Sequence, residues 1–239
     1  MTCLPVINMN SDIMSRLIYM YKFRLPIIIV CIIILIILRI YLVKLSPMIE
    51  IFNTKNKDNK LVCIGDSILN NTNYVPVGKS VINYLRGDMV DVINVAQDNA
   101  KIEDVYDQIR RIPDIKSNMN IILSVGGNDL LEYGPIKPVY EKYIKLVRYI
   151  TDKYIDTYKC KLYVLNLYYP KDESMKKYYK IIRNWNSLLV NIPIKYNINM
   201  NIIDISKIIK EPTDLVHEIE PSATGGLKIA DKIIQSVNK

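Results

Sequence analysis

The sequence predicts an α/β fold, a three-layer α/β/α sandwich in which helices cover both faces of a parallel sheet. From residue 61 onward, short apolar stretches alternate with segments of helical character, and this alternation is typical of a parallel sheet. The chain has 239 residues, enough for one sizeable domain of this kind plus an appendage. We therefore expect one domain over residues 61–239, with a separate segment before it.

The first half of this domain supplies three strands and two helices. Residues 61–64 are an apolar run with β-branched side chains, long enough for a buried strand and too short for a helix. Residues 77–86 are expected to form a helix that Gly87 closes. The remaining expected elements are a strand over 90–95, a helix over 102–112 with apolar residues at helical spacing, and a strand over 120–125.

The second half continues the alternation. Pro138 opens a helix expected to run to about residue 158, and a strand follows over 161–167. A helix rich in tyrosine and lysine is expected over 174–190. The last two expected elements are a strand over 201–205 and a helix over 226–237, which makes five strands in all.

The segment before the domain predicts a membrane anchor. Residues 25–43 are almost wholly apolar, with Arg39 as the single charge, and a bilayer core needs ~20 such residues in a helix. We expect a polar, basic segment over 1–24, an uncleaved transmembrane helix over 25–45 and a lysine-rich linker over 46–60. A cleaved signal peptide would need small residues at its cleavage site, and a buried core helix is rarely apolar on every face. The expected location is a membrane, whereas lysines and arginines on both sides leave the orientation open.

Composition argues against nucleic-acid binding and against a zinc site or disulfide framework. The formal charge is +8, but the basic residues are scattered and are not interleaved with aromatic residues, so no nucleic-acid partner is expected. An anionic membrane surface is an equally good partner for that charge. The four cysteines have neither the spacing of a zinc site nor that of a disulfide framework.

A serine follows the first strand. Gly65, Asp66 and Ser67 come directly after the apolar run, which places a hydroxyl on a tight turn at the carboxyl end of a strand. Ligands of open α/β sheets bind at that edge. An ordinary turn is the alternative, because these residue types are common in turns.

Gly126, Gly127, Asn128 and Asp129 follow the third strand. The glycines allow a sharp turn and leave room for a ligand, and the Asn128 amide could donate to an oxyanion. After the second strand, a backbone N–H near Asn99 could be another donor, because asparagine tolerates a positive φ. A capping loop and an ordinary strand-to-helix loop are the alternatives at these two places.

The chain has one histidine, His217, three residues after Asp214. The aspartate could bond one ring nitrogen and fix the tautomer of the imidazole. Acyl transfer by a serine at neutral pH needs a base near the hydroxyl, and this is the only imidazole available.

Together these residues resemble the motifs of the SGNH (GDSL-type) hydrolases, which are serine esterases and lipases. Gly65-Asp66-Ser67 is similar to the nucleophile block of that family, Gly126-Gly127-Asn128-Asp129 to its Gly-x-Asn-Asp block, and Asp214-x-x-His217 to its terminal block. The resemblance spans residues 61 to about 237 and implies a flavodoxin-like fold with a parallel five-stranded sheet.

Two departures from the family pattern stand out. The family usually has glycine where Asn99 aligns. It also continues directly from the histidine into a Pro-Ser-Ala-x-Gly-like stretch, whereas here residues 218–220 intervene before Pro221-Ser222.

The resemblance implies hydrolysis of a carboxylic acyl or acetyl ester by Ser67, His217 and Asp214. The oxyanion would be held by the N–H groups of Ser67 and Asn99 and by the Asn128 amide. Gly65, Asp66, Gly127 and Asp129 would support the site, with no metal or other cofactor. The expected substrates are lipid esters or acylated glycans and proteins. A transacylase, or a scaffold of this fold without catalysis, remains an alternative.

Overall fold

The computed structural model of the chain describes residues 30, 32–40, 60–88, 91–113, 118–133 and 135–238. Contacts between Cα atoms divide the chain into residues 1–54 and 55–239. In the first unit, residues 32–40 are helical, and their large hydrophobic side chains are 49% to 64% exposed. No helix within the described residues has the length and apolarity that crossing a membrane requires. Most of the predicted anchor over 25–45 lies outside the described residues, so it stays a prediction.

The second unit contains the predicted parallel sheet. Its strands are β1 (Lys60–Gly65), β2 (Asp91–Asn94), β3 (Met119–Ser124), β4 (Lys161–Leu165) and β5 (Asn201–Ile203). They lie in the order β2-β1-β3-β4-β5, and every neighbouring pair is parallel. This is the strand order of flavodoxin-like folds. The expected fold class is therefore confirmed, with β1 and β3 in the buried centre of the sheet.

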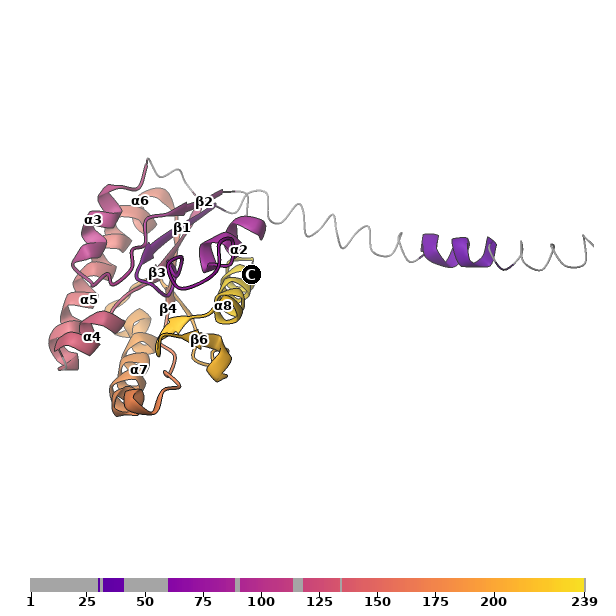
Figure 1. Ribbon diagram of the computed structural model, residues 1–239. Coiled ribbons are helices and arrows are strands. Elements are labelled where there is room, and N and C mark those ends of the chain that lie inside the picture. Colours follow the sequence, from indigo (N-terminus) through magenta and orange to yellow (C-terminus); the bar gives the residue numbers. More distant parts are fainter. Residues whose placement is uncertain are drawn as a thin grey trace, which may run out of the picture. The chain divides into compact units, whose positions relative to one another are not determined.

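Helices cover both faces of the sheet (Figure 1). One face carries α2 (Val81–Asp88) and α8 (Ala223–Val237), which pack against each other. The other carries α3 (Asp104–Arg110), α5 (Ile136–Ile150) and α7 (Tyr179–Tyr196). Two short helices, α4 (Gly127–Tyr133) and α6 (Asp156–Tyr158), complete the set of labelled helices.

Several helix boundaries differ from the predicted ones, and at two of them a serine side chain caps the first turn. The first helix begins at Val81 and not at residue 77, because the Ser80 hydroxyl accepts a hydrogen bond from the Asn83 N–H and caps its first turn. The last helix begins three residues earlier than predicted, after Ser222, which accepts from the Gly225 N–H. The helix expected over 138–158 is interrupted by a π-helical segment over Thr151–Ile155, where the Thr151 hydroxyl bonds the Val147 carbonyl.

The structure also contains two elements that the sequence did not predict. One is α4, which begins at Gly127, directly after Gly126. The other is a short antiparallel hairpin of β6 (Leu215–Val216) and β7 (Glu220–Pro221). Each of these strands has two residues, which is too short for a hydrophobic period to be recognised.

Candidate active site

The turn that presents Ser67 requires glycine at residue 65. Gly65 has φ +126°, and a Cβ there would lie 1.7 Å from the carbonyl oxygen of Ser124 on β3. The buried Gln108 side chain then fixes the turn from α3, since its Oε1 accepts from the Gly65 N–H at 2.6 Å and its Nε2 donates to the Gly65 carbonyl at 2.8 Å. The Ser67 N–H has no acceptor among the described residues and is available to a ligand.

Asp66 is buried beneath this turn. Its carboxylate accepts from the Ser124 hydroxyl at 2.8 Å and from the Ile68 N–H at 3.2 Å. Burial raises the pKa of Asp66 to about 7, even though these two hydrogen bonds lower it. The nearby Glu220 carboxylate raises it further.

The partner of the Ser67 hydroxyl is Glu220 and not a histidine. Ser67 Oγ donates to Glu220 Oε1 at 3.1 Å, and both side chains are buried. Burial raises the pKa of Glu220, as does the Asp98 charge, while the hydrogen bond from Ser67 and the His217 charge lower it. The second carboxylate oxygen, Oε2, is buried without a partner among the described residues. An unpaired buried acceptor is costly, and such atoms are often found at functional sites.

Hydrogen bonds on both sides hold Glu220 in place. The Tyr168 hydroxyl donates to the carbonyl of the preceding residue, Ile219, at 2.5 Å. The buried Asn71 side chain donates to the carbonyl of the following residue, Pro221, at 2.9 Å, and its Oδ1 accepts from the Val81 N–H at the start of α2. These two bonds fix the backbone on either side of Glu220.

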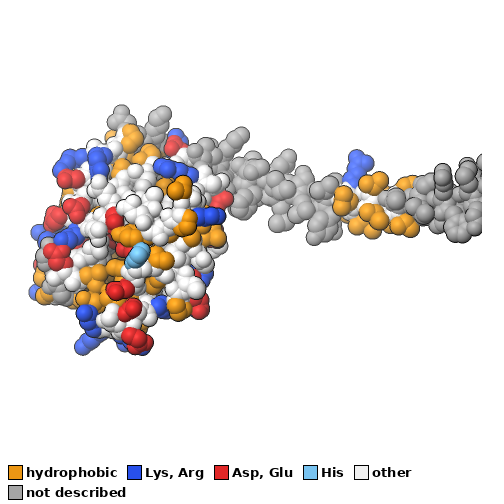
Figure 2. Space-filling model, viewed as in Figure 1, with side chains coloured by type: hydrophobic (Ala, Val, Ile, Leu, Met, Phe, Trp, Pro, Cys, Tyr) orange, Lys and Arg blue, Asp and Glu red, His pale blue; other side chains and the backbone are white. Residues whose placement is uncertain are grey.

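His217 lies at the tip of the hairpin, exposed to solvent. It has φ +45°, and the next residue, Glu218, has φ +70°, so the two form the turn between β6 and β7. Its ring centroid is 5.8 Å from that of Tyr74, whose hydroxyl donates to Asp98 at 2.6 Å. Figure 2 shows this histidine in pale blue on the molecular surface. Within the described residues it makes no hydrogen bond to Ser67 or Asp214.

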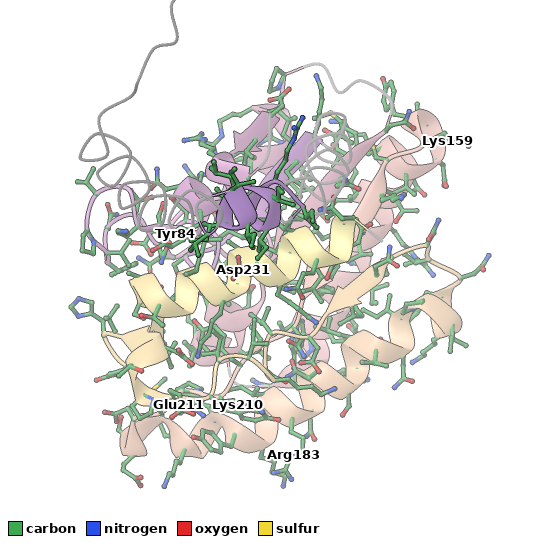
Figure 3. The ribbon with its side chains drawn as sticks, turned by 90° about the vertical axis from the view of Figure 1, so that its right-hand side faces the viewer. Tyr84, Lys159, Arg183, Lys210, Glu211 and Asp231 are labelled. Carbon is green, nitrogen blue, oxygen red and sulfur yellow. The ribbon has the colours of Figure 1, made fainter. Side chains whose placement is uncertain are left out.

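Asp214 does not orient the histidine either. Lys228 Nζ donates to its two carboxylate oxygens at 2.7 and 2.9 Å, and the N–H groups of Lys210 and Glu211 donate to Oδ2 at 3.0 Å. Figure 3 labels both of the residues that supply these N–H groups. Burial raises the pKa of Asp214, but these hydrogen bonds outweigh it and hold the pKa below its ordinary value.

The predicted Ser67–His217–Asp214 triad is therefore not assembled in this structure. The physical reason is the inserted residues 218–220, which form the turn and second strand of the hairpin. They carry His217 outward and bring Glu220 to the serine.

Asn128 lines the same pocket as Ser67, and its role as an oxyanion donor stays a prediction. Its Nδ2 donates to the Ala100 carbonyl at 3.0 Å, which leaves the second N–H of the amide for an oxyanion. Its neighbour Asp129 is buried and accepts from the Ile102 N–H at 3.1 Å, and this bond fixes the loop before α3. Asn99 has the expected positive φ, 57°, but its side chain is exposed, and its role as a donor stays a prediction.

A pocket opens directly beside this group. It encloses about 600 Å³ of empty space, part of it open to solvent. Ser67, Gly127, Asn128 and Glu220 contribute to one part of its wall. Most of the remaining lining is apolar and comes from Leu130, Leu131, Leu167, Met175, Ile181 and Ile182, among others.

The residues that the sequence did not identify are Glu220, Asn71, Gln108 and Lys228. A signal for one of them was present. Glu220 directly precedes Pro221-Ser222, the position that the catalytic histidine takes in the family pattern. Asn71 and Gln108 bond backbone groups of distant segments, and Lys228 forms an ion pair with Asp214. No local sequence pattern indicates these contacts. Within the described residues, no group of three or more His, Cys, Asp or Glu is placed to hold a metal ion.

Comparisons with known proteins support the fold. No protein-family model matches the sequence, and no curated protein matches it. Solved structures do match. A lipolytic protein of the G-D-S-L family from Veillonella parvula is 19% identical, with a TM-score of 0.60 over 74% of this chain and 97% of that one.

Two further matches are an acetyl xylan esterase from Geobacillus stearothermophilus and a GDSL-like lipase from Bacteroides thetaiotaomicron. The esterase is 15% identical, with a TM-score of 0.56 over 76% of this chain and 95% of its own. The lipase is 11% identical, with a TM-score of 0.56 over 77% of this chain and 89% of its own. The chain thus has the fold of the GDSL hydrolases, with a glutamate beside its serine.

Proposed function

We propose that this chain hydrolyses carboxylic esters, with Ser67 as nucleophile and Glu220 as general base. The observation that supports this most directly is the buried hydrogen bond from Ser67 Oγ to Glu220 Oε1, in the wall of a largely apolar pocket. The likeness to lipases and acetyl xylan esterases supports the same reaction class.

In the first half of the reaction, Ser67 Oγ attacks the carbonyl carbon while its proton passes to Glu220. The Ser67 N–H and the Asn128 amide stabilise the oxyanion, and removing one such donor typically costs about 100- to 1,000-fold in rate. When the intermediate collapses, the bond to the alcohol oxygen breaks and the Glu220 carboxyl protonates the leaving alcohol. Water, deprotonated by Glu220, then attacks the acyl-serine; the bond to Ser67 Oγ breaks, Glu220 returns the proton to that oxygen, and the free acid leaves.

A carboxylate is a weaker base than an imidazole, and the structure compensates in part. Burial raises the pKa of Glu220, and a base of higher pKa accepts a proton more readily. Activity should rise with pH through the raised pKa of Glu220, because only the ionised carboxylate can act as base.

The test is hydrolysis of p-nitrophenyl butyrate by the full chain and four variants. Ser67→Ala should abolish turnover, and Glu220→Gln should lower kcat by about 100- to 10,000-fold. Glu218→Gln is the matched control on the same hairpin, where the side chain is exposed, and it should leave kcat unchanged. His217→Ala should change kcat by less than about threefold, because a base outside hydrogen-bond reach of the serine contributes little.

A large loss in His217→Ala together with full activity in Glu220→Gln would contradict the proposal. That result would show that the hairpin rearranges and that the histidine is the base after all.

A binding protein of the same fold is the second candidate. The exposed His217 and the pairing of Asp214 with Lys228 favour it, because both leave the serine without an imidazole. A fluorophosphonate probe reacts only with an activated serine. Labelling that disappears in Ser67→Ala supports the hydrolase, and an unlabelled wild-type chain supports the binding protein.

A further inference from the structure

The pocket beside Ser67 gives the proposed reaction a substrate class. We infer that it holds the acyl chain of the ester, and that this chain is an aliphatic one longer than an acetyl group. The inference rests on the proposed function, since it assigns the pocket to the acyl side of the bond that Ser67 cleaves.

The first argument is the composition of the lining. The side chains beyond the reacting group come from four separate parts of the fold: α4, the loop after β4, the segment before α7 and the start of α7 itself. Most of them are apolar, which matches a hydrocarbon better than a sugar with its many hydroxyl groups. An acetyl group would leave most of this surface unused.

The second argument is where the polar groups lie. The charge of Asp98 raises the pKa of Glu220 and the charge of His217 lowers it. Tyr74 contacts both residues, through a hydrogen bond to Asp98 and through its ring to His217. None of the three lines the pocket. The leaving alcohol must take its proton from Glu220 and then depart to solvent, so its natural place is this polar, exposed side. The acyl chain, which stays bonded to the serine while water enters, is left with the apolar side.

The size of the effect follows from the burial of methylene groups. Each methylene moved from water into an apolar site favours binding about fourfold, equivalent to ~0.8 kcal/mol. An octanoyl chain has six more methylenes than an acetyl group, and incomplete burial reduces the gain. We expect kcat/KM to be about 100-fold higher for octanoyl than for acetyl esters.

A pair of isomeric esters separates the acyl side from the alcohol side. Ethyl octanoate and octyl acetate have the same atoms and closely similar hydrophobicity, but they carry the long chain on opposite sides of the ester bond. The full chain should hydrolyse ethyl octanoate faster by about tenfold or more in a titration of released acid. Equal rates, or faster hydrolysis of octyl acetate, would overturn the inference.

Filling the pocket supplies a second test. Ile181 is half-buried on α7 and lines the pocket, whereas Arg183, two residues away, is exposed and is labelled at the lower edge of Figure 3. Ile181→Trp should lower kcat/KM for ethyl octanoate by about tenfold and leave ethyl acetate within about twofold. Arg183→Trp is the matched control and should change neither. An equal effect of Ile181→Trp on both esters would count against an acyl pocket.

A binding measurement keeps this inference separate from the catalytic proposal. Calorimetry on the full-length Ser67→Ala variant should show ethyl octanoate binding and ethyl acetate not binding at the same concentration. Binding of this kind without turnover by the wild type would uphold the pocket and refute the hydrolase. Turnover without any preference for chain length would uphold the hydrolase and refute the acyl pocket. Neither binding nor turnover would refute both proposals.

Discussion

Asp66 is the carboxyl group whose replacement tests the electrostatics of the site most directly. Burial raises its pKa from 3.8 to about 7. At about 1.4 kcal/mol for each pKa unit, this difference amounts to about 4 kcal/mol. Because the folded pKa lies above the unfolded one, the unfolded chain loses its proton first as the pH rises. The free energy of unfolding should therefore fall between about pH 4 and pH 7.

The Asp66→Asn variant has no proton to lose at this position. Its free energy of unfolding should therefore lack the decrease that the ionisation of Asp66 causes in the wild type. Relative to the wild type, its free energy of unfolding should increase by about 4 kcal/mol between pH 4 and pH 8. Urea unfolding followed by fluorescence measures this difference, because Trp185 is the single tryptophan of the chain and is fully buried. The control is Asp231→Asn, at an exposed site on α8 (Figure 3), which should follow the wild-type profile.

The same free-energy difference between Asp66→Asn and wild type at pH 4 and pH 8 would refute this reasoning. It would mean that the carboxyl of Asp66 ionises in the folded protein as easily as in the unfolded chain.

Two further predictions concern the supports of the site. Gly65→Ala should destabilise the protein by more than about 4 kcal/mol or prevent folding, because the added Cβ would meet the Ser124 carbonyl. Gly78→Ala, at a positive φ in open space, should cost only about 1–3 kcal/mol, and equal urea midpoints for the two variants would contradict the steric argument. Lys228→Met should cost about 1–2 kcal/mol at pH 7, since it removes a charged donor from the buried Asp214. Burial raises the pKa of Asp214, but the hydrogen bonds from Lys228 and two backbone N–H groups hold it below its ordinary value, so the stabilisation is lost only as the pH falls through that lowered pKa, and the cost should be smaller in strong acid than at pH 7. A cost that is the same at both pH values would show that Lys228 acts by packing alone.

The parallel sheet and the positions of two glycine turns at its edge could be predicted from the sequence. Each strand of the parallel sheet is a short apolar run between helical segments, and this pattern is local, so it can be read without knowing any contact. The turn at Gly65 and the Gly126-Gly127 turn directly follow strands β1 and β3, which are neighbours in the sheet. Because parallel strands end at the same edge, Ser67 and Asn128 are expected at one edge of the sheet, and both line the same pocket.

The partner of the serine could not be predicted from the sequence. His217 and Glu220 lie three residues apart on one loop, and both are chemically able to accept a proton. The choice depends on the hairpin of β6 and β7, whose two-residue strands carry no periodic signal, and on hydrogen bonds from Tyr168 and Asn71 to the carbonyls on either side of Glu220. These contacts join segments far apart in the chain. Local spacing therefore identified the loop, and long-range packing selected the residue within it.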